Sequence, residues 1–472
     1  MAVMLREPKP ARPLPPGPRI PPIVQTLAWG LAPTWMMDIC SRLVGDTFTQ
    51  TFAPSGFQVV NISDPQAVTT LLTAPEEVAP KPTGGAGAPV WVLGHNSLSV
   101  LVGPEHMRQR KLLLPFFHGE RLREHESTIA EATRRAVAGW PHGEPLNVQH
   151  EMRLITLDVI MESVFGMEAG AMSSLRSTIV EMVDTNTLAW RLRMLVRSGH
   201  GQERPRNKLG RMVDRLDEQI YAEIASRRRQ SDLEQRSDIM SMLLLARDED
   251  GEGLSDVEVR DELVTLLLAG HETTATTVAW AIERLVRHPD KLARLFGEID
   301  AGSEGGGEEY LVAVINETLR VRPVQPAVVR VLTEDLQVGR HLLPAGTSTV
   351  VSIYLANRNP GVYKEPRSFQ PERFLEEAPG TYTWVPFGGG IRRCIGASFA
   401  QMEAKLILAT MLSELEPRLP QGRRSRRGER MRWSHRTLAP SRGATVIWRR
   451  RSASTDRPQA AASGADRQPQ HA

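Results

Sequence analysis

FGGGIRRCIG, residues 387–396, is the stretch that decides the fold, and it contains one of the two cysteines of the chain, Cys394. A thiolate is a strong metal ligand but a costly buried charge, and glycines remove side-chain bulk where the backbone comes close to another group. Arg392 and Arg393 precede the cysteine and can offset negative charge nearby. The stretch is therefore typical of a site where a flat, anionic, metal-bearing cofactor lies against the main chain with sulphur as its axial ligand. Haem fits this description.

Two simpler interpretations exist for this stretch. A lone reduced cysteine is usually a small buried hydrophobe, and a glycine-rich run is often only a loop or a phosphate-binding turn. The phosphate interpretation fails because no Gly-Lys-Ser/Thr follows the glycines and no G-x-G-x-x-G precedes a helix. Residues 397–415 instead predict a long helix with an apolar stripe, so Cys394 would lie where N-terminal amide dipoles stabilise a thiolate. Cys40 has no such context, and we expect it to be core packing.

Further motifs occur along the chain, in the order Ala269-Gly270-His271-Glu272-Thr273-Thr274, Glu317-Thr318-Leu319-Arg320 and Pro371-Glu372-Arg373-Phe374. With FGGGIRRCIG and the proline-rich Leu14-Pro15-Pro16-Gly17-Pro18, they resemble the cytochrome P450 superfamily of haem-thiolate monooxygenases. The resemblance implies a single domain over residues 14–450, mainly α with a smaller β portion, that encloses haem b. It leaves a flexible N-terminus over residues 1–13 and a tail over 451–472 whose composition predicts disorder.

Length and charge bound the class of protein. For 472 residues the length prior suggests about three domains, but the ordered motifs favour one. The net charge is +3, and its arginine-rich runs at 423–432 and 449–451 lack interleaved aromatics, which predicts solvated loops and no nucleic-acid partner. No run reaches the ~18 apolar residues of a spanning helix, and no apolar signal core precedes Pro8. We therefore expect a cytoplasmic enzyme without a membrane anchor.

The clearest predicted helix runs from about Ser255 to His288, because Ser255 and Glu258 form a capping-box pattern and Pro289 follows His288. Within it Glu262, Leu266, Ala269 and Thr273 share one face, which is small in the middle. One interpretation is a buried helix in which Gly270 makes a packing notch. The other is a groove beside Ala269 and Thr273, where Glu272 and Thr273 relay protons to bound oxygen.

Glu317 and Arg320 lie three residues apart and are neighbours on one helical face. Taken alone, such a pair is usually exposed and contributes about 0.2–0.5 kcal/mol. The resemblance implies a different role, a buried ion-pair network in which Arg373 joins the pair and holds the region behind the cysteine. Removing one partner of such a network leaves an uncompensated buried charge.

Haem carries two propionates, so cations are needed near it. The resemblance assigns these contacts to His106, Arg110, Arg330 and Arg392, and it places Phe387 and Gly396 of the cysteine stretch against the cofactor. Each arginine by itself is more often solvated. Asn357-Arg358-Asn359-Pro360 departs from the His-Arg-Asp-Pro of many relatives, which affects a structural turn more than chemistry.

The resemblance implies insertion of one oxygen atom from O2 into an apolar organic substrate, by C–H hydroxylation or epoxidation. Because the chain lacks flavin and iron–sulphur motifs, electrons would come from a separate ferredoxin and an NAD(P)H-dependent ferredoxin reductase, docking near Arg392, Arg393, Arg108 and Lys111. Pocket residues are expected within 78–101, 172–206, 265–269 and 324–329. A peroxide-driven or rearranging haem-thiolate enzyme and a haem-binding sensor are the alternatives, and Glu272-Thr273 favours oxygen activation over both.

Overall fold

The computed structural model of the chain describes residues 13–82, 90–166, 173–184, 204–302, 308–378, 380–422, 425, 427–434 and 437–451. The predictions of a flexible start and a disordered tail concern residues that lie almost entirely outside these ranges. They stay predictions.

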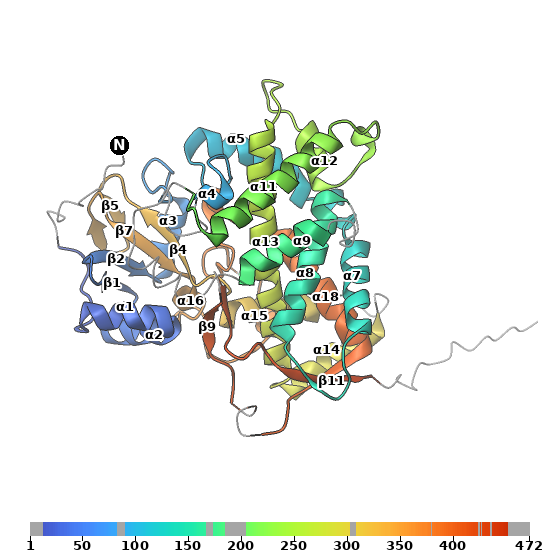
Figure 1. The fold of residues 1–472 in the computed structure, drawn as a ribbon. Coiled ribbons are helices and arrows are strands. Elements are labelled where there is room, and N and C mark those ends of the chain that lie inside the picture. The colour runs from blue at the N-terminus through green and yellow to red at the C-terminus, as the bar shows by residue number, and fades with distance from the viewer. Residues whose placement is uncertain are drawn as a thin grey trace, which may run out of the picture.

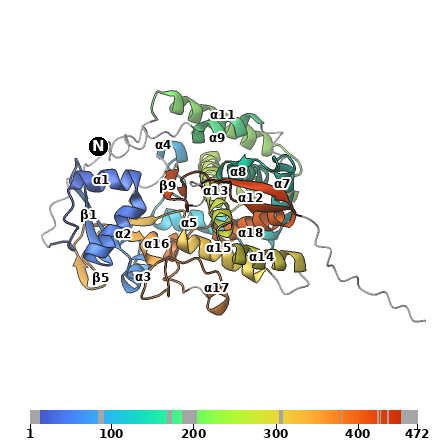
Figure 2. The ribbon, with the colours of Figure 1, turned by 90° about the horizontal axis from the view of Figure 1, so that it is seen from below.

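A 30-residue helix, α13 (Asp256–Leu285), runs through the middle of the helical part of the molecule (Figures 1 and 2). The predicted capping box is confirmed, since the Glu258 amide donates to Ser255 Oγ at 3.3 Å and the Ser255 amide donates to Glu258 Oε2 at 2.8 Å. The helix ends at Leu285, before the predicted stop at His288. Pro289 instead opens the next helix, α14 (Pro289–Ala301), at a first-turn position where its missing N–H costs nothing.

The helices that pack most extensively on α13 are α8 (Val148–Phe165), α18 (Ala397–Glu414) and α15 (Glu309–Val321). Helix α18 confirms the helix predicted over 397–415. These four helices bury the apolar core of the helical part, which explains why α13 is buried on nearly every side. Further helices surround them, namely α4 (Val90–Leu93), α5 (Gly103–Leu113), η1 (Leu114–Phe117), α6 (Glu120–Arg123), α7 (Glu126–Ala138), α9 (Ser173–Asp184), α11 (Lys208–Arg227), η2 (Leu233–Gln235), α12 (Ile239–Leu245), α17 (Arg373–Glu376) and η4 (Gly390–Arg392).

The β portion lies to one side, at the left of Figure 1, with α1 (Pro22–Leu31), α2 (Pro33–Val44), α3 (Pro65–Thr73) and α16 (Ile353–Ala356) around it. Its main sheet has the order β1-β2-β7-β4, where only the β2–β7 pair is parallel. The strands are β1 (Thr47–Phe52), β2 (Phe57–Ile62), β7 (Ser348–Ser352) and β4 (Ala327–Val331). A separate apolar cluster joins this sheet to α3, so the molecule is mainly α with a smaller β portion, as predicted.

Smaller sheets tie distant segments together. Strand β11 pairs with β8 and β3, and the β9–β10 hairpin reaches α13, where Trp280 Nε1 donates to the Leu438 carbonyl at 2.8 Å. The C-terminal strands therefore close the helical part from below. The strands of the smaller sheets are β3 (Pro145–Leu146), β5 (Leu336–Val338), β6 (His341–Leu343), β8 (Leu415–Arg418), β9 (Met431–Ser434), β10 (Thr437–Pro440) and β11 (Val446–Arg450).

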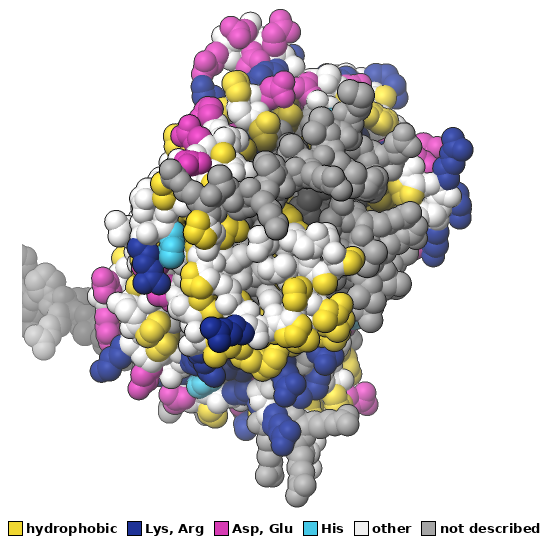
Figure 3. All heavy atoms as spheres, turned by 90° about the vertical axis from the view of Figure 1, so that its left-hand side faces the viewer, with side chains coloured by type: hydrophobic (Ala, Val, Ile, Leu, Met, Phe, Trp, Pro, Cys, Tyr) yellow, Lys and Arg dark blue, Asp and Glu magenta, His cyan; other side chains and the backbone are white. Residues whose placement is uncertain are grey.

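Helix α1 turns its polar side inward. Gln25 is buried and accepts from the Thr51 amide at 3.0 Å, while Thr26 Oγ1 accepts from the Ala53 amide at 2.9 Å. Leu27 and Leu31 are exposed, and Figure 3, which faces the β side of the molecule, shows hydrophobic side chains gathered beside Lys and Arg on this surface. Within the described ranges, none of the helices is long and apolar enough to cross a membrane.

Candidate haem-binding site

The cysteine stretch forms a tight loop between Phe387 and α18. The Cys394 amide donates to the Phe387 carbonyl at 2.9 Å, and Gly388 and Gly390 adopt φ of +69° and +62°, where glycine is strongly preferred. A Cβ on Gly390 would lie 1.9 Å from the carbonyl oxygen of Leu72 in α3. Gly390 therefore makes room for α3, whereas the sequence interpretation assigned the close approach to a cofactor. At Gly396 a Cβ would meet no atom within 4 Å, so space is open there.

Cys394 lies directly before the first turn of α18, as predicted, and it is exposed. The surrounding protein partly shields the thiol from water, and this desolvation raises its pKa. A hydrogen bond from the Gly396 amide and the charges of Arg393 and Arg110 act in the opposite direction. Cys40 is fully buried in a cluster with Met36 and Phe48, and burial raises the pKa of its thiol to about 11. It is core packing, as expected.

The middle of α13 opens on one side. Ala269 is exposed and Thr273 is half-buried, although most other residues of this helix are buried. Thr273 Oγ1 donates to the Ala269 carbonyl at 2.8 Å, a back-bond that keeps its hydroxyl close to the helix. A Cβ on Gly270 would lie 3.1 Å from Ile160 Cδ1 of α8. Both interpretations of this face therefore hold in part, because Gly270 is a packing notch and Ala269 borders an open space.

Glu272 is turned toward α8 and the β9–β10 hairpin. Its Oε1 accepts from Arg153 Nη2 at 3.3 Å and from Thr437 Oγ1 at 3.1 Å, and the side chain is buried. Arg153 also donates to Ser434 Oγ at 2.6 Å. The carboxylate is thus held in a polar contact between three elements.

Four predicted cationic residues converge beside the cysteine loop: His106, Arg110, Arg330 and Arg392. Burial lowers the pKa of His106 to about 4 and that of Arg330 to about 10, and it lowers the pKa of both other guanidinium groups. Neighbouring arginines also lower the pKa values of His106, Arg110 and Arg330. The carboxylate of Glu76 acts in the opposite direction on His106, Arg330 and Arg392. These side chains therefore lie close together with too little negative charge between them.

The hydrogen bonds of this cluster show the same shortage. Among the described residues, the Arg330 guanidinium has one acceptor, the Val329 carbonyl at 2.9 Å, and that of Arg110 has none. Arg392 is the exception, since its Nε donates to Glu76 Oε1 at 2.7 Å and its Nη2 to the Leu101 carbonyl at 2.5 Å. Arg330 and Arg392 share the carboxylate of Glu76, and Arg110 faces the Cys394 thiol, so positive charge is in surplus here.

The predicted group of Glu317, Arg320 and Arg373 is brought together in full. Arg320 Nε donates to Glu317 Oε2 at 2.6 Å and its Nη2 to Glu317 Oε1 at 2.8 Å, and both side chains are completely buried. Arg373 Nε lies 3.2 Å from Glu317 Oε2. Arg320 also donates to the carbonyls of Asn357, Pro366 and Ser368. The turn at Asn357 is therefore structural, as predicted.

An aromatic chain joins this network to the cysteine loop. Phe374 follows Arg373 and lies 6.0 Å from Trp384, whose ring in turn lies 6.0 Å from Phe387, both pairs edge to face. Trp384 Nε1 donates to the Asn316 carbonyl at 3.2 Å, next to Glu317. Packing therefore links Glu317 to the residue that starts the cysteine loop.

The family model described as Cytochrome P450 matches residues 15–442. The chain belongs to the cytochrome P450 family. Putative cytochrome P450 135B1 of Mycobacterium tuberculosis is 37% identical over 437 residues, which is 92% of this chain and 91% of that protein. Putative cytochrome P450 137 of the same organism is 41% identical over 364 residues, 76% of this chain and 74% of that protein.

Solved structures agree on the fold. A retinoic acid-bound cyanobacterial CYP120A1 superposes with a TM-score of 0.78 at 24% identity, over 93% of this chain and 99% of that one. The haem domain of cytochrome P450DA gives a TM-score of 0.77 at 22% identity, over 93% and 98% of the two chains. The cytochrome P450 fold predicted from the motifs is confirmed. This protein is therefore a haem-thiolate monooxygenase that uses haem, O2, a substrate and redox partners.

The residues of this cytochrome P450 fit the haem that its family uses. The surplus of positive charge on the buried Arg330 and the half-buried Arg110 and Arg392 matches the acidic propionates, and an exposed thiol on the same loop matches a sulphur ligand. Ala269 and Gly396 border open space, so neither would collide with a flat ring. The chemistry of the donors thus agrees with the cofactor.

The structure adds residues that the sequence interpretation missed. Glu76 is the carboxylate partner of Arg392, and Arg153 is the cationic partner of Glu272. Glu262 and Glu403 are buried carboxyl groups on α13 and α18, and burial raises the pKa of each to about 8. The signal for Glu403 was present, because it is the one acidic residue in the apolar middle of 397–412.

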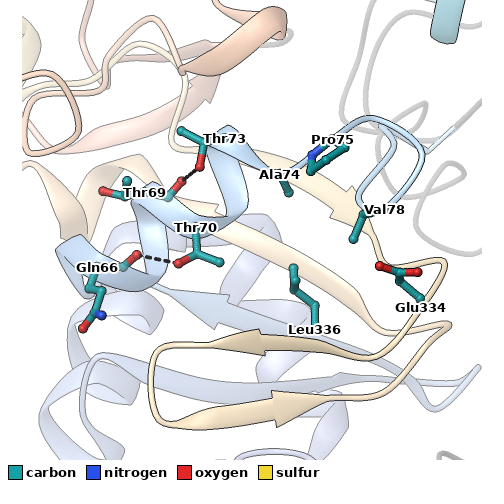
Figure 4. Close-up of a pocket in the computed structure, with 9 residues that line it drawn as sticks. All are labelled: Gln66, Thr69, Thr70, Thr73, Ala74, Pro75, Val78, Glu334 and Leu336. Carbon is teal, nitrogen blue, oxygen red and sulfur yellow. Dashed lines mark hydrogen bonds between the residues drawn. The ribbon is translucent and has the colours of Figure 1, made fainter.

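An open surface cleft of about 640 Å³ lies between α3 and the segment that leads into β5 (Figure 4), and its lining includes none of the predicted haem-binding or catalytic residues. The hydroxyls of Thr70 and Thr73 bond back to the carbonyls of their own helix at 3.0 and 2.8 Å. Its lining contains no lysine or arginine. This cleft therefore lacks the cations that an acidic cofactor needs.

Proposed function

We propose that the enzyme binds haem b with the Cys394 thiolate as axial ligand and inserts one oxygen atom into an apolar organic substrate, by C–H hydroxylation or epoxidation. The observation that carries this proposal is the surplus of buried and half-buried guanidinium groups beside an exposed cysteine. When bound, haem supplies the iron at which O2 is reduced. Arg110, Arg330 and Arg392 would hold the propionates, with His106 as a further hydrogen-bonding partner.

Phe387 and Gly396 of the cysteine loop would contact the cofactor, and the exposed Ala269 leaves room for it. The packing from Glu317 through Trp384 to Phe387 keeps the cysteine loop in one conformation. Such support matters because the residues that pack behind a metal ligand determine its position and orientation. We therefore assign Glu317, Arg320 and Arg373 a structural role.

Glu272 and Thr273 deliver protons on the distal side. The two side chains have different partners, since Thr273 bonds to the Ala269 carbonyl and Glu272 contacts Arg153 and Thr437. Transfer between them therefore needs a bridging water or a rotamer change of Glu272. Arg153 Nη2 lies 3.3 Å from Glu272 Oε1, so the carboxyl group faces a positive charge.

An apolar substrate is supported by the side chains around the opening. Leu266 and Leu267 precede Ala269 on α13, and Val328 and Val329 of β4 are half-buried. Apolar walls with few polar groups suit an apolar ligand. Parts of the predicted pocket segments, residues 83–89 and 185–203 among them, lie outside the described residues.

Electrons come from a separate ferredoxin and an NAD(P)H-dependent ferredoxin reductase in the cytoplasm. The expected docking surface is smaller than the sequence indicates, because Arg392 turns inward to Glu76 and Arg108 pairs with Asp248 at 2.6 Å. Arg393 is exposed on the cysteine loop. We place the acidic partner over Arg393.

Isotopically labelled O2 tests the reaction class. With a ferredoxin, its reductase and NAD(P)H, the proposal expects one labelled oxygen atom in the product of an apolar substrate found by its spin-state shift. A peroxide-driven or rearranging enzyme would form product without NAD(P)H and without that label. A haem-binding sensor would shift its spin state but form no product.

A further inference from the structure

Residues 94–101 run between α13 and the cysteine loop and are bonded to both. On the α13 side, Asp261 Oδ2 accepts from the backbone amide and the side-chain amide of Asn96, at 3.0 and 3.1 Å. Glu262 Oε1 accepts from the Leu98 amide at 2.6 Å. Ser97 Oγ and Thr265 Oγ1 lie 2.6 Å apart. The carboxyl groups of two neighbouring residues of α13 thus accept hydrogen bonds from the backbone amides of Asn96 and Leu98.

On the other side, cations hold the carbonyl groups of the same segment. Arg392 Nη1 donates to the Leu98 carbonyl at 3.3 Å and Arg392 Nη2 donates to the Leu101 carbonyl at 2.5 Å. Lys81 Nζ donates to the Ser99 carbonyl at 2.6 Å. Leu98 is therefore fixed at its amide by α13 and at its carbonyl by the cysteine loop. Its peptide groups form a short bridge between the two.

The bridge is built into the interior. Asp261, Glu262 and Ser97 are buried, so their bonds do not compete with water. Arg260 Nη1 donates to Asp261 Oδ1 at 2.9 Å, and Arg260 Nε is itself held by Asp217 of α11 at 2.7 Å. Asp261 is thus supported from behind.

Gly94 shows how closely the segment approaches α13. Its φ is +88°, and a Cβ there would lie 1.9 Å from Asp261 Oδ1. A glycine is required at this point because any side chain would displace the carboxylate.

We infer that Asp261 and Glu262 are positioning residues, which fix residues 96–101 and through the carbonyls of Leu98 and Leu101 set the place of Arg392. The inference rests on the proposed function in one respect, that Arg392 faces a haem propionate. Leu98 and Val100 pack against the main core with half-buried side chains. A ligand that contacts these two side chains would shift the backbone carbonyl groups to which Arg392 donates. The bridge would thereby couple ligand binding to the position of the Arg392 guanidinium.

Two substitutions at Glu262 separate its hydrogen bond from its bulk. Burial raises the pKa of Glu262 to about 8, so Glu262→Gln resembles the neutral acid present at pH 7 and keeps an oxygen for the Leu98 amide. Glu262→Leu keeps similar volume but removes that acceptor. Glu403→Leu is the matched control, because Glu403 is similarly buried, bonds to Thr274 of α13 and has no hydrogen bond or ion pair with the described residues 94–101.

The experiment compares the full-length variants by hydrogen exchange of a peptide spanning residues 94–102 and by spectral titration with phenylimidazole. For Glu262→Leu we expect exchange in this peptide to accelerate at least about tenfold and the apparent Kd of phenylimidazole to rise about tenfold, as it would if the ordered segment were populated a tenth of the time. Glu262→Gln should stay within about twofold of the wild type. Glu403→Leu should leave both readouts unchanged.

The inference is overturned if Glu403→Leu changes both readouts as much as Glu262→Leu does, or if Glu262→Gln behaves like Glu262→Leu. The exchange measurement does not depend on the cofactor. If haem is bound in another way, the titration fails for the wild type as well, while exchange still decides whether Glu262 holds the segment.

Discussion

Two groups of arginine side chains flank the cysteine loop, and they are buried in different ways. Around Glu317, every donor of Arg320 that the structure describes meets a carboxylate or carbonyl oxygen, and Arg373 adds a second ion pair. Beside the cysteine loop, the guanidinium groups of Arg110, Arg330 and Arg392 outnumber the carboxylates, of which Glu76 is the one that acts on Arg330 and Arg392, and burial lowers the pKa of all three arginines. The first group is complete within the protein. The second is complete only with an added anion, which is how a ligand site differs from a structural network.

The largest effect is expected where the complete network is broken. Glu317→Ala leaves Arg320 and Arg373 buried without their carboxylate, and we expect the free energy of unfolding to fall by about 3–5 kcal/mol. Urea unfolding measures this change. Glu309→Gln, an exposed acid on the same helix, should change it by less than about 0.5 kcal/mol. Equal effects of the two variants would contradict the contrast.

Removing a cation from the incomplete group should act in the opposite sense on the protein without haem. Arg330→Leu removes a desolvated charge, so the free energy of unfolding of the apoprotein should stay equal or rise. Haem affinity should fall about tenfold to a hundredfold, since a charge-assisted hydrogen bond contributes about 1.5–3 kcal/mol. Haem transfer to apomyoglobin and urea unfolding measure the two effects.

Arg340→Leu, on an exposed hairpin position of the β portion, is the control for Arg330→Leu and should change neither quantity. A loss of apoprotein stability in Arg330→Leu with unchanged haem affinity would place Arg330 with the structural network instead.

Glu403 is a third kind of buried group, a carboxyl group without an arginine partner among the described residues, and it can be tested through the pH dependence of stability. Burial raises the pKa of Glu403 from 4.5 to about 8, so its contribution to stability is fully present below pH 4.5 and is lost as the pH rises through about 8. Relative to Glu403→Gln, the wild type should lose about 1.4 kcal/mol per pH unit within this window. Urea unfolding at several pH values tests this, and parallel curves for the two proteins would refute it.

The last prediction concerns the proposed proton relay, in which Glu272 contacts one arginine and one threonine. Thr273→Ala should lower the yield of product per NAD(P)H several-fold and release peroxide, because proton delivery is slowed. Glu272→Gln should slow turnover about a hundredfold while leaving the Kd of the substrate unchanged. Peroxide and product assays measure both, and unchanged coupling in Thr273→Ala would remove Thr273 from the relay.

The local patterns were enough to predict part of this arrangement. The Ser255-x-x-Glu258 pattern and the apolar periodicity after Ala397 predicted two helices, because both signals lie within a few residues. The spacing of Glu317 and Arg320 predicted a pair on one face, while its burial and the addition of Arg373 came only from the family resemblance. The contrast between the two arginine groups was not visible in the sequence.

The remaining contacts join residues that no local pattern relates. Glu76 and Arg392 are separated by 316 residues, and Arg153 and Glu272 by 119. The reason for Gly390 also lies elsewhere in the chain, since it is the carbonyl of Leu72 that excludes a side chain there. Glu262 was placed on the correct helix face but received no role, because its partner is a backbone amide of residue 98 and an amide has no sequence signature.

The reduced, carbon monoxide-bound absorption spectrum tests the central claim most directly, that Cys394 is the thiolate ligand which the surplus of arginines accompanies. The wild type and Cys40→Ala should both show the red-shifted Soret band of thiolate-ligated haem, and Cys394→His should lose it while still binding haem. A thiolate-type band that persists in Cys394→His, or its absence from the wild type, would contradict the assignment.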